Sequence, residues 1–558
     1  MYDFSYHSIS EQDKKLNEAI ATIDQKARDL GLEHIDTIFE IVSQDRMREL
    51  SSYIIPIRYH HWTFGREYYK ARTLDKYGQG GRLYEMVINS NPAYAWLLDQ
   101  NTLTENKLVV AHVFGHVDFS ENNILYQATD KKIISTCAQN AEIISEYSFK
   151  YGEEIVERWI DACLTLSWNI NLNPVINKEY KWMHRGNSED LKRELPELLD
   201  SMDNFEPLFV AERIKEMLIM RQMTQNPEPI MEVDLLLFFL HEAKNLSKWQ
   251  RDIMAIIHEE QNYFRPNIQT HIVNEGWATW WHKKILTDLD VEQDFLKENG
   301  EDMFYKFLSM HSNVAAPIRK GALHPYFVGY KMWDYMYRGF MNPTEKFKKH
   351  HNIDRALTEK EAIERMKMYR SFSTNSSFFR DFLDETLVEE LDLFNFRLID
   401  DEWVVTENNW RSIRDNLTKM LSNAGQPRIY VVDDNYKDQG ELYLIQDFDG
   451  HIMDDTSIRK TLDYVGKIWI KPVHLEVVDR TNDEYSFNTK TGMKKFSPGD
   501  EYCKVYTYRG TKDDIEIRDL PIFPRSIEDR GRIIVGDTSR KIRENKRAIE
   551  KKVNNVIF

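Results

Sequence analysis

Two histidines with four-residue spacing, His112 and His116, occur in the segment AHVFGHVDF at residues 111–119. In a helix, residues i and i+4 lie on one face about 6 Å apart along the axis, so both imidazoles can reach one divalent ion. Zinc peptidases use the same pair but carry a glutamate directly after the first histidine as general base, whereas this chain has Val113. The spacing therefore predicts a metal site without the usual base, in which Asp118 could orient a ring. A pair of hydrogen-bonded core histidines is the alternative.

A second candidate is the segment NEGWATWWH at residues 274–282. Glu275 lies among apolar and aromatic residues, where a buried carboxylate needs a cation, a hydrogen-bond partner or a proton. Glu275 and His282 are seven positions apart, or about 10.5 Å along a helix, so we expect only one of them to bind the ion. The other residue would hydrogen-bond to a ligand of the ion, contact substrate or bind a second ion. His271 and Glu275 have the better i, i+4 spacing and form a competing pair.

The third candidate is Glu260, a predicted general base. On a helix it shares one apolar stripe with Ile253, Ile256, Ile257 and Phe264. This pattern predicts that Glu260 faces inward while Glu259 points elsewhere. An inward glutamate close in sequence to Glu275 could be a base or a ligand. The structural alternative is a salt bridge to Arg265 or Arg319.

Three further residues are predicted to contact substrate. His61 belongs to the aromatic-rich segment HHWTFG at residues 60–65, which could line a cleft or serve packing alone. His324 and Tyr326 flank Pro325, which biases His324 toward an extended conformation at a helix entry, where substrates often bind.

The surrounding sequence predicts an α+β fold with a large, mainly helical body over residues 1–390. Apolar residues at three- and four-residue spacing predict helices over 10–50, 80–100, 105–118, 138–165, 205–223, 232–264, 269–288 and 300–311. Short β-branched and aromatic runs at 428–432, 441–445 and 473–477, with a helix at 454–466, predict a small α+β domain over 391–480. Residues 481–558 form an extension with a basic helix at 539–552.

Composition narrows the classes of protein. The 558 residues carry 91 acidic and 74 basic side chains, a net charge of −17 that argues against wrapping nucleic acid. The start has no signal-peptide pattern, and the longest apolar run, 235–240, is too short to cross a bilayer, so we expect a cytoplasmic protein. The three cysteines lie far apart without CxxC spacing, so a metal would use histidine and carboxylate ligands.

Several segments, taken together and in order, resemble the stage V sporulation protein R (SpoVR) family over residues 40–480. Besides the segments at 60–65, 111–119 and 274–282, they are YEMVINSNPAYAWLLDQNTL at 84–103, EEQNYFRP at 259–266, HPYFVGY at 324–330, LVEELDLFNF at 387–396, YVVDDNYKDQGELYLIQ at 430–446 and YVGKIWIKPVHLE at 464–476. His258 and His271 depart from the family pattern, which weakens His271 as a ligand. The departure favours His112, His116 and Glu275, with His282 and Glu260 in support.

The resemblance implies a role in sporulation, at the stage concerned with the spore cortex. Similar proteins occur in bacteria that form no spores, so spore formation cannot be their whole role, and the genes beside them imply a shared stress or starvation pathway. Relatives are encoded beside a PrkA-like serine kinase and a protein with a von Willebrand-type domain, and these are the expected partners. No reaction comes with the family name, so the chemistry rests on the residues.

Two hypotheses follow from these residues. The first is a metal-dependent hydrolase of an amide or peptide bond, in which His112, His116 and Glu275 hold a zinc ion and Glu260 accepts the proton. A variant of it uses iron or two metals and draws in Glu85 and His282. The alternative is a non-catalytic regulatory or scaffold protein, in which the histidine and glutamate cluster is structural and the α+β domain binds a kinase or similar partner.

Overall fold

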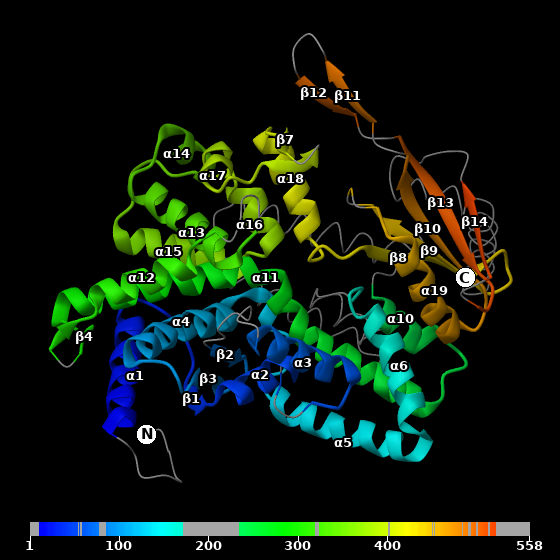
Figure 1. Cartoon of the computed structure of the whole chain (residues 1–558), viewed down its shortest axis with the longest axis horizontal. Helices are drawn as coiled ribbons and strands as arrows, with labels where there is room; N and C mark the ends of the chain where they lie inside the picture. The colour runs from blue at the N-terminus through cyan, green and yellow to red at the C-terminus, as the bar shows by residue number, and fades with distance from the viewer. Residues whose placement is uncertain are drawn as a thin grey trace, which may run out of the picture. The chain divides into compact units, whose positions relative to one another are not determined.

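The computed structural model describes residues 11–53, 55, 58–76, 85–170, 234–298, 300–317, 323–399, 402–448, 450, 452–481, 484–488, 493–497, 500–511 and 514–519. The chain divides into two compact units, each formed by two separate stretches (Figure 1). The first unit takes residues 1–157 and 262–425, and the second takes residues 158–261 and 426–558. Helices dominate the first unit and a five-stranded sheet organises the second, which confirms the α+β class. The predicted domain boundaries at 390 and 480 stay predictions.

The first unit is mainly helical. Its N-terminal stretch contains α1 (Glu11–Asp29), α2 (Gln44–Tyr53), α3 (Trp62–Lys76), α4 (Leu103–Asn122), the 3-10 helix η1 (Ile124–Tyr126), α5 (Ile133–Tyr151) and the start of α6 (Glu153–Leu166). Its second stretch contains the later part of α11 (Lys248–Gln293), α12 (Phe304–Val314), α13 (Pro325–Met341), α14 (Glu345–His351), α15 (Glu359–Phe372), α16 (Asn375–Phe382), α17 (Glu385–Glu390) and α18 (Trp410–Leu421). Two hairpins accompany them, β4 (Lys297–Glu298) with β5 (Glu301–Asp302), and β6 (Asn395–Ile399) with β7 (Glu402–Glu407). None of the described helices combines the length and the apolar character needed to span a membrane.

A three-stranded sheet in the first unit corrects two helix predictions. The strands are β1 (Thr37–Val42), β2 (Glu85–Ile88) and β3 (Ala93–Leu98), in the order β1-β3-β2. β1 runs parallel to β3, and β2 runs antiparallel to it. The predicted helix over 80–100 is therefore wrong, and the predicted helix over 10–50 is interrupted by β1. The reason is that β3 is buried at nearly every position, and a short continuous apolar run has the same pattern in a buried strand and a buried helix.

Three helices of the first unit meet at glycines. α4 begins with a capping box formed by Thr102 and Glu105, and most of its residues are buried. A Cβ at Gly115 of α4 would lie only 2.7 Å from the Ala278 Cα of α11. A Cβ at Gly329 of α13 would lie 2.8 Å from the Gly276 Cα of α11 and would also collide with the Ile272 carbonyl oxygen. Glycine at these positions therefore lets α4 and α13 touch the backbone of α11.

The second unit is built on a five-stranded sheet with the order β14-β13-β10-β9-β8. The strands are β8 (Arg428–Tyr436), β9 (Glu441–Asp447), β10 (Val473–Arg480), β13 (Glu501–Tyr508) and β14 (Ile515–Asp519). β9 and β10 are parallel, and α19 (Asp455–Trp469) connects them. The unit also contains α10 (Leu235–Glu242), the first part of α11 and the hairpin of β11 (Glu484–Asn488) and β12 (Met493–Ser497).

The structure confirms the elements predicted for the small α+β domain. The predicted strands at 428–432, 441–445 and 473–477 correspond to β8, β9 and β10, and the predicted helix at 454–466 corresponds to α19. The predicted helices at 205–223 and 539–552 lie outside the described residues.

Candidate metal centre

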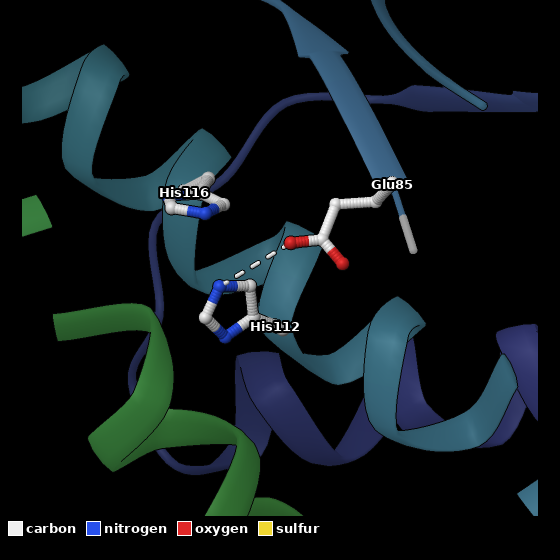
Figure 2. Close-up of side chains that lie close together, drawn as sticks. All are labelled: Glu85, His112 and His116. Carbon is white, nitrogen blue, oxygen red and sulfur yellow. Dashed lines mark ion pairs between the residues drawn. The ribbon is translucent and has the colours of Figure 1, made fainter. Parts of the chain in front are cut away.

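The two histidines of α4 meet a carboxylate from the neighbouring sheet. His112 and His116 lie one turn apart with ring centroids separated by 4.5 Å, and Glu85 reaches them from the start of β2 (Figure 2). The Glu85 Oε1 atom lies 3.6 Å from the His112 Nε2 atom. One donor atom from each of the three residues lies within 4.8 Å of the others. Two imidazole nitrogens and one carboxylate oxygen form a donor set that suits zinc.

Glu275 of α11 completes the cluster. Its Oε2 atom lies 3.4 Å from the Nε2 atoms of both His112 and His116, as a single-ion site requires. Its Oε1 atom lies 3.6 Å from the Nδ1 atom of His271, whose side chain is 54% exposed. The structure therefore joins His112, His116 and Glu275 across about 160 residues of chain, and places His271 at the exposed rim.

The cluster is electrostatically coupled. Burial works against the charged form of His116, but the Glu275 carboxylate and a hydrogen bond to Asn274 raise the pKa of this imidazole to about 9. Burial likewise opposes ionisation of Glu275, yet His116 and His112 hold the pKa of its carboxyl well below the usual range. Burial raises the pKa of Glu85, partly offset by the two histidines. The histidines thus favour the charged form of Glu275, whereas burial disfavours the charged form of Glu85, a cost that a nearby cation would offset.

The predicted ligand His282 lies behind His112. Its Nδ1 atom is 3.0 Å from the His112 Nδ1 atom, on the side of the ring away from Glu85 and Glu275. The His282 Nε2 atom is 2.8 Å from the Nδ1 atom of His311 on α12. Burial and the neighbouring His311 hold the pKa of His282 well below its ordinary value. Burial and Lys283 lower the pKa of His311 to about 4. Both rings are neutral at neutral pH.

Tyr326 joins the site from the first turn of α13. Its ring stacks on His112 with a centroid distance of 5.8 Å, and its hydroxyl lies near the Glu275 carboxylate. The Glu275 charge and burial raise the pKa of this phenol, so it stays protonated and can donate a hydrogen bond. The neighbouring His324 is extended at the helix entry, with φ −80° and ψ 113°, as Pro325 predicts.

The other predicted substrate-contacting side chains have local contacts. His324 lies 2.8 Å from the Ala316 carbonyl oxygen through Nδ1, and its ring centroid is 5.6 Å from that of Tyr326. His61 is buried and lies 2.7 Å from the Thr63 hydroxyl through Nδ1. The His61 ring packs edge-on against Phe64, which agrees with the packing alternative. Substrate contact by His61 and His324 stays a prediction.

Glu260 lies in the part of α11 that belongs to the second unit, fifteen residues before Glu275. Its inward orientation is as predicted, because it is fully buried while Glu259 is exposed. Its role as general base stays a prediction. Glu275, in contrast, lies beside the histidines.

Asp118 has a structural role, contrary to the prediction that it orients an imidazole. One of its oxygens accepts a hydrogen bond from the Trp277 indole at 2.8 Å, and the other pairs with Arg370 at 2.6 Å. Asp118 is fully buried, so it is a paired charge of the core.

Glu85 and His311 complete the set of residues around the two histidines. From the sequence, Glu85 was expected only in the variant that uses iron or two metals. His311 was not predicted, and its only sequence signal is a lone polar residue at a buried position of a short helix.

Fold and site together define a mainly helical α+β protein with a buried histidine and carboxylate centre. The family model described as "SpoVR like protein" matches residues 10–426, which include every residue of this centre. The chain therefore belongs to the SpoVR-like family, as the resemblance predicted. It is similar to the uncharacterized protein YcgB of Escherichia coli (strain K12), with 29% identity over 481 residues that cover 83% of this chain and 91% of YcgB. No solved structure matches the chain significantly.

Proposed function

We propose that this SpoVR-like protein is a metal-dependent hydrolase of an amide or peptide bond, with zinc as the first candidate ion and iron as an alternative. One observation carries the proposal, namely that Glu275 lies 3.4 Å from the Nε2 atoms of both histidines, while Glu85 approaches His112 from another element. Two imidazoles, one ligating carboxylate and a second adjacent carboxylate are the parts of a hydrolytic zinc site.

The proposed roles differ in part from those expected from sequence. Glu85, His112 and His116 would hold the ion, since their donor atoms converge within 4.8 Å. A bound divalent ion would polarise a water molecule and the carbonyl group under attack. Glu275 would accept the proton of that water, in the role first assigned to Glu260, because its carboxylate lies beside both histidines. Tyr326 would donate a hydrogen bond to the negative charge that develops on the carbonyl oxygen.

The biological setting is proposed from the family alone. A SpoVR-like protein would act in the cytoplasm, in spore cortex formation or in a stress response. A PrkA-like serine kinase and a protein with a von Willebrand-type domain would be its partners. Peptidoglycan fragments are therefore the first substrates to test.

The test combines metal analysis with a hydrolysis assay. The full chain is purified gently, its metal content is measured by elemental analysis, and the zinc-loaded protein is incubated with muropeptides and short peptides. We expect Glu275→Gln to retain the metal and lose turnover by about 10²- to 10⁴-fold, since it removes only proton acceptance. Glu85→Gln and the double variant His112→Ala, His116→Ala should lose the metal while staying folded.

Glu260→Gln is the matched variant on the same helix. If Glu275 is the base, the Glu260→Gln protein should hydrolyse the substrate at the wild-type rate. Loss of turnover in this variant alone would assign the role of general base to Glu260. The hydrolase proposal would be overturned if the wild type contained no stoichiometric metal, or if the zinc-loaded protein hydrolysed none of these substrates. Either result would favour the regulatory or scaffold protein.

A further inference from the structure

A chain of three imidazoles leads from the metal centre into the core of the first unit. His112, His282 and His311 come from α4, α11 and α12 and are 2%, 0% and 5% exposed. Nitrogen atoms of successive rings are separated by 3.0 Å and 2.8 Å, which are hydrogen-bond distances. Each neutral imidazole has one N–H donor and one lone pair, so the two bonds of the chain must point in the same direction.

One direction of the two hydrogen bonds leaves the His112 Nε2 atom free to bind an ion, and the opposite direction places a proton there. An ion at the His112 Nε2 atom needs the lone pair there, which places the His112 proton on Nδ1. The His282 Nδ1 atom must then accept that proton's hydrogen bond, so His282 carries its own proton on Nε2 and donates to the His311 Nδ1 atom. In the reverse direction, His112 carries its proton on Nε2, facing Glu275 at 3.4 Å, and cannot bind an ion.

We propose that His282 and His311 are positioning residues of the metal centre, which orient His112 and hold its proton on Nδ1. This inference rests on the proposed metal site, and it holds whatever reaction the site catalyses. Histidine ligands in metalloproteins commonly donate their second N–H to a carboxylate, carbonyl or water, and such partners affect metal affinity. His116 has a partner of this kind in Asn274, whose Oδ1 atom lies 3.0 Å from the His116 Nδ1 atom.

The surroundings of His311 favour an uncharged imidazole at the end of the row of three histidines. The Lys283 ammonium donates to the Tyr330 hydroxyl at 2.7 Å, and the Tyr330 ring packs edge-on against His311 at 4.9 Å. A nearby cation disfavours a second proton on His311, so this ring can accept from His282.

The test measures zinc affinity of full-length variants by competition with a chromophoric chelator. His282→Phe leaves the His112 Nδ1–H without its acceptor, and we expect about 10- to 100-fold weaker binding. His282→Asn places an amide oxygen near the former Nδ1 position and should recover most of the affinity, which a merely space-filling role would not predict. His311→Phe removes the last acceptor and should weaken binding in the same direction.

His351→Phe is the matched control. His351 is a buried histidine of the same unit, packed against Phe347 and Phe382. The His351→Phe protein should bind zinc with wild-type affinity. Wild-type affinity in His282→Phe, or equal loss in His282→Asn and His282→Phe, would overturn the positioning role while leaving the hydrolase intact. Zinc binding that depends on His282 in a protein without hydrolytic activity would support the positioning role and refute the hydrolase.

Discussion

Gly329→Ala tests the contact of α13 with α11 that brings Tyr326 to the site. A methyl group at position 329 would lie 2.8 Å from the Gly276 Cα and would also collide with the Ile272 carbonyl oxygen. These are backbone atoms that no rotamer change can move, so α13 has to shift, and such overpacking costs about 1–3 kcal/mol. Alanine favours a helix over glycine by about 1 kcal/mol. We therefore expect a net loss of about 0–2 kcal/mol in the free energy of unfolding relative to the wild type.

Urea unfolding of the metal-free protein and zinc competition measure the two consequences. Gly65→Ala is the control, because Gly65 also lies in a helix but has no heavy atom within 4 Å of an added Cβ. It should be as stable as the wild type or slightly more stable. Gly329→Ala should also perturb the site, because Tyr326 lies about one turn earlier on α13 and moves with it. Equal stability of the two alanine variants would refute the close approach of α11 and α13.

Three further predictions concern other side chains. Asp118→Asn removes the buried partner of Arg370, which keeps a 3.6 Å ion pair with the exposed Glu33, and should lower the free energy of unfolding by about 3 kcal/mol in urea titrations. A change below about 1 kcal/mol would contradict the buried pair. Tyr326→Phe should keep the metal and lower turnover on an identified substrate by about 10²- to 10³-fold, whereas unchanged turnover would exclude its hydroxyl from catalysis. Burial lowers the pKa of His351 to about 3 in the folded protein. The unfolded chain therefore binds a proton at this residue near pH 6.5, whereas the folded protein does not. The free energy of unfolding should therefore fall as pH falls below 6.5, by about 1.4 kcal/mol per pH unit from this group. His351→Phe should remove that contribution to the pH dependence of stability between pH 6.5 and 5. Identical pH dependence of stability in wild type and variant would contradict the lowered pKa of His351.

Local patterns in the sequence predicted the helix faces on which several of these side chains lie. The four-residue spacing of His112 and His116 on α4, the carboxylate of Glu275 in an apolar helix and the inward face of Glu260 all follow from helical periodicity. The extended conformation of His324 follows from Pro325. These features depend only on residues within one or two turns, which is the range over which side-chain periodicity carries information.

The tertiary structure decided which of these groups meet. Glu85 reaches His112 only because β2 pairs antiparallel with β3, and the segment was misread because a buried strand and a buried helix share one apolar pattern. The position of His282 behind His112, the contact of His282 with His311 and the pairing of Asp118 with Arg370 join residues that lie 29 to 252 positions apart. Periodicity shows which face of an element is buried, but not which element covers it. That choice depends on the packing of whole helices, here on the glycines that let α4 and α13 touch α11.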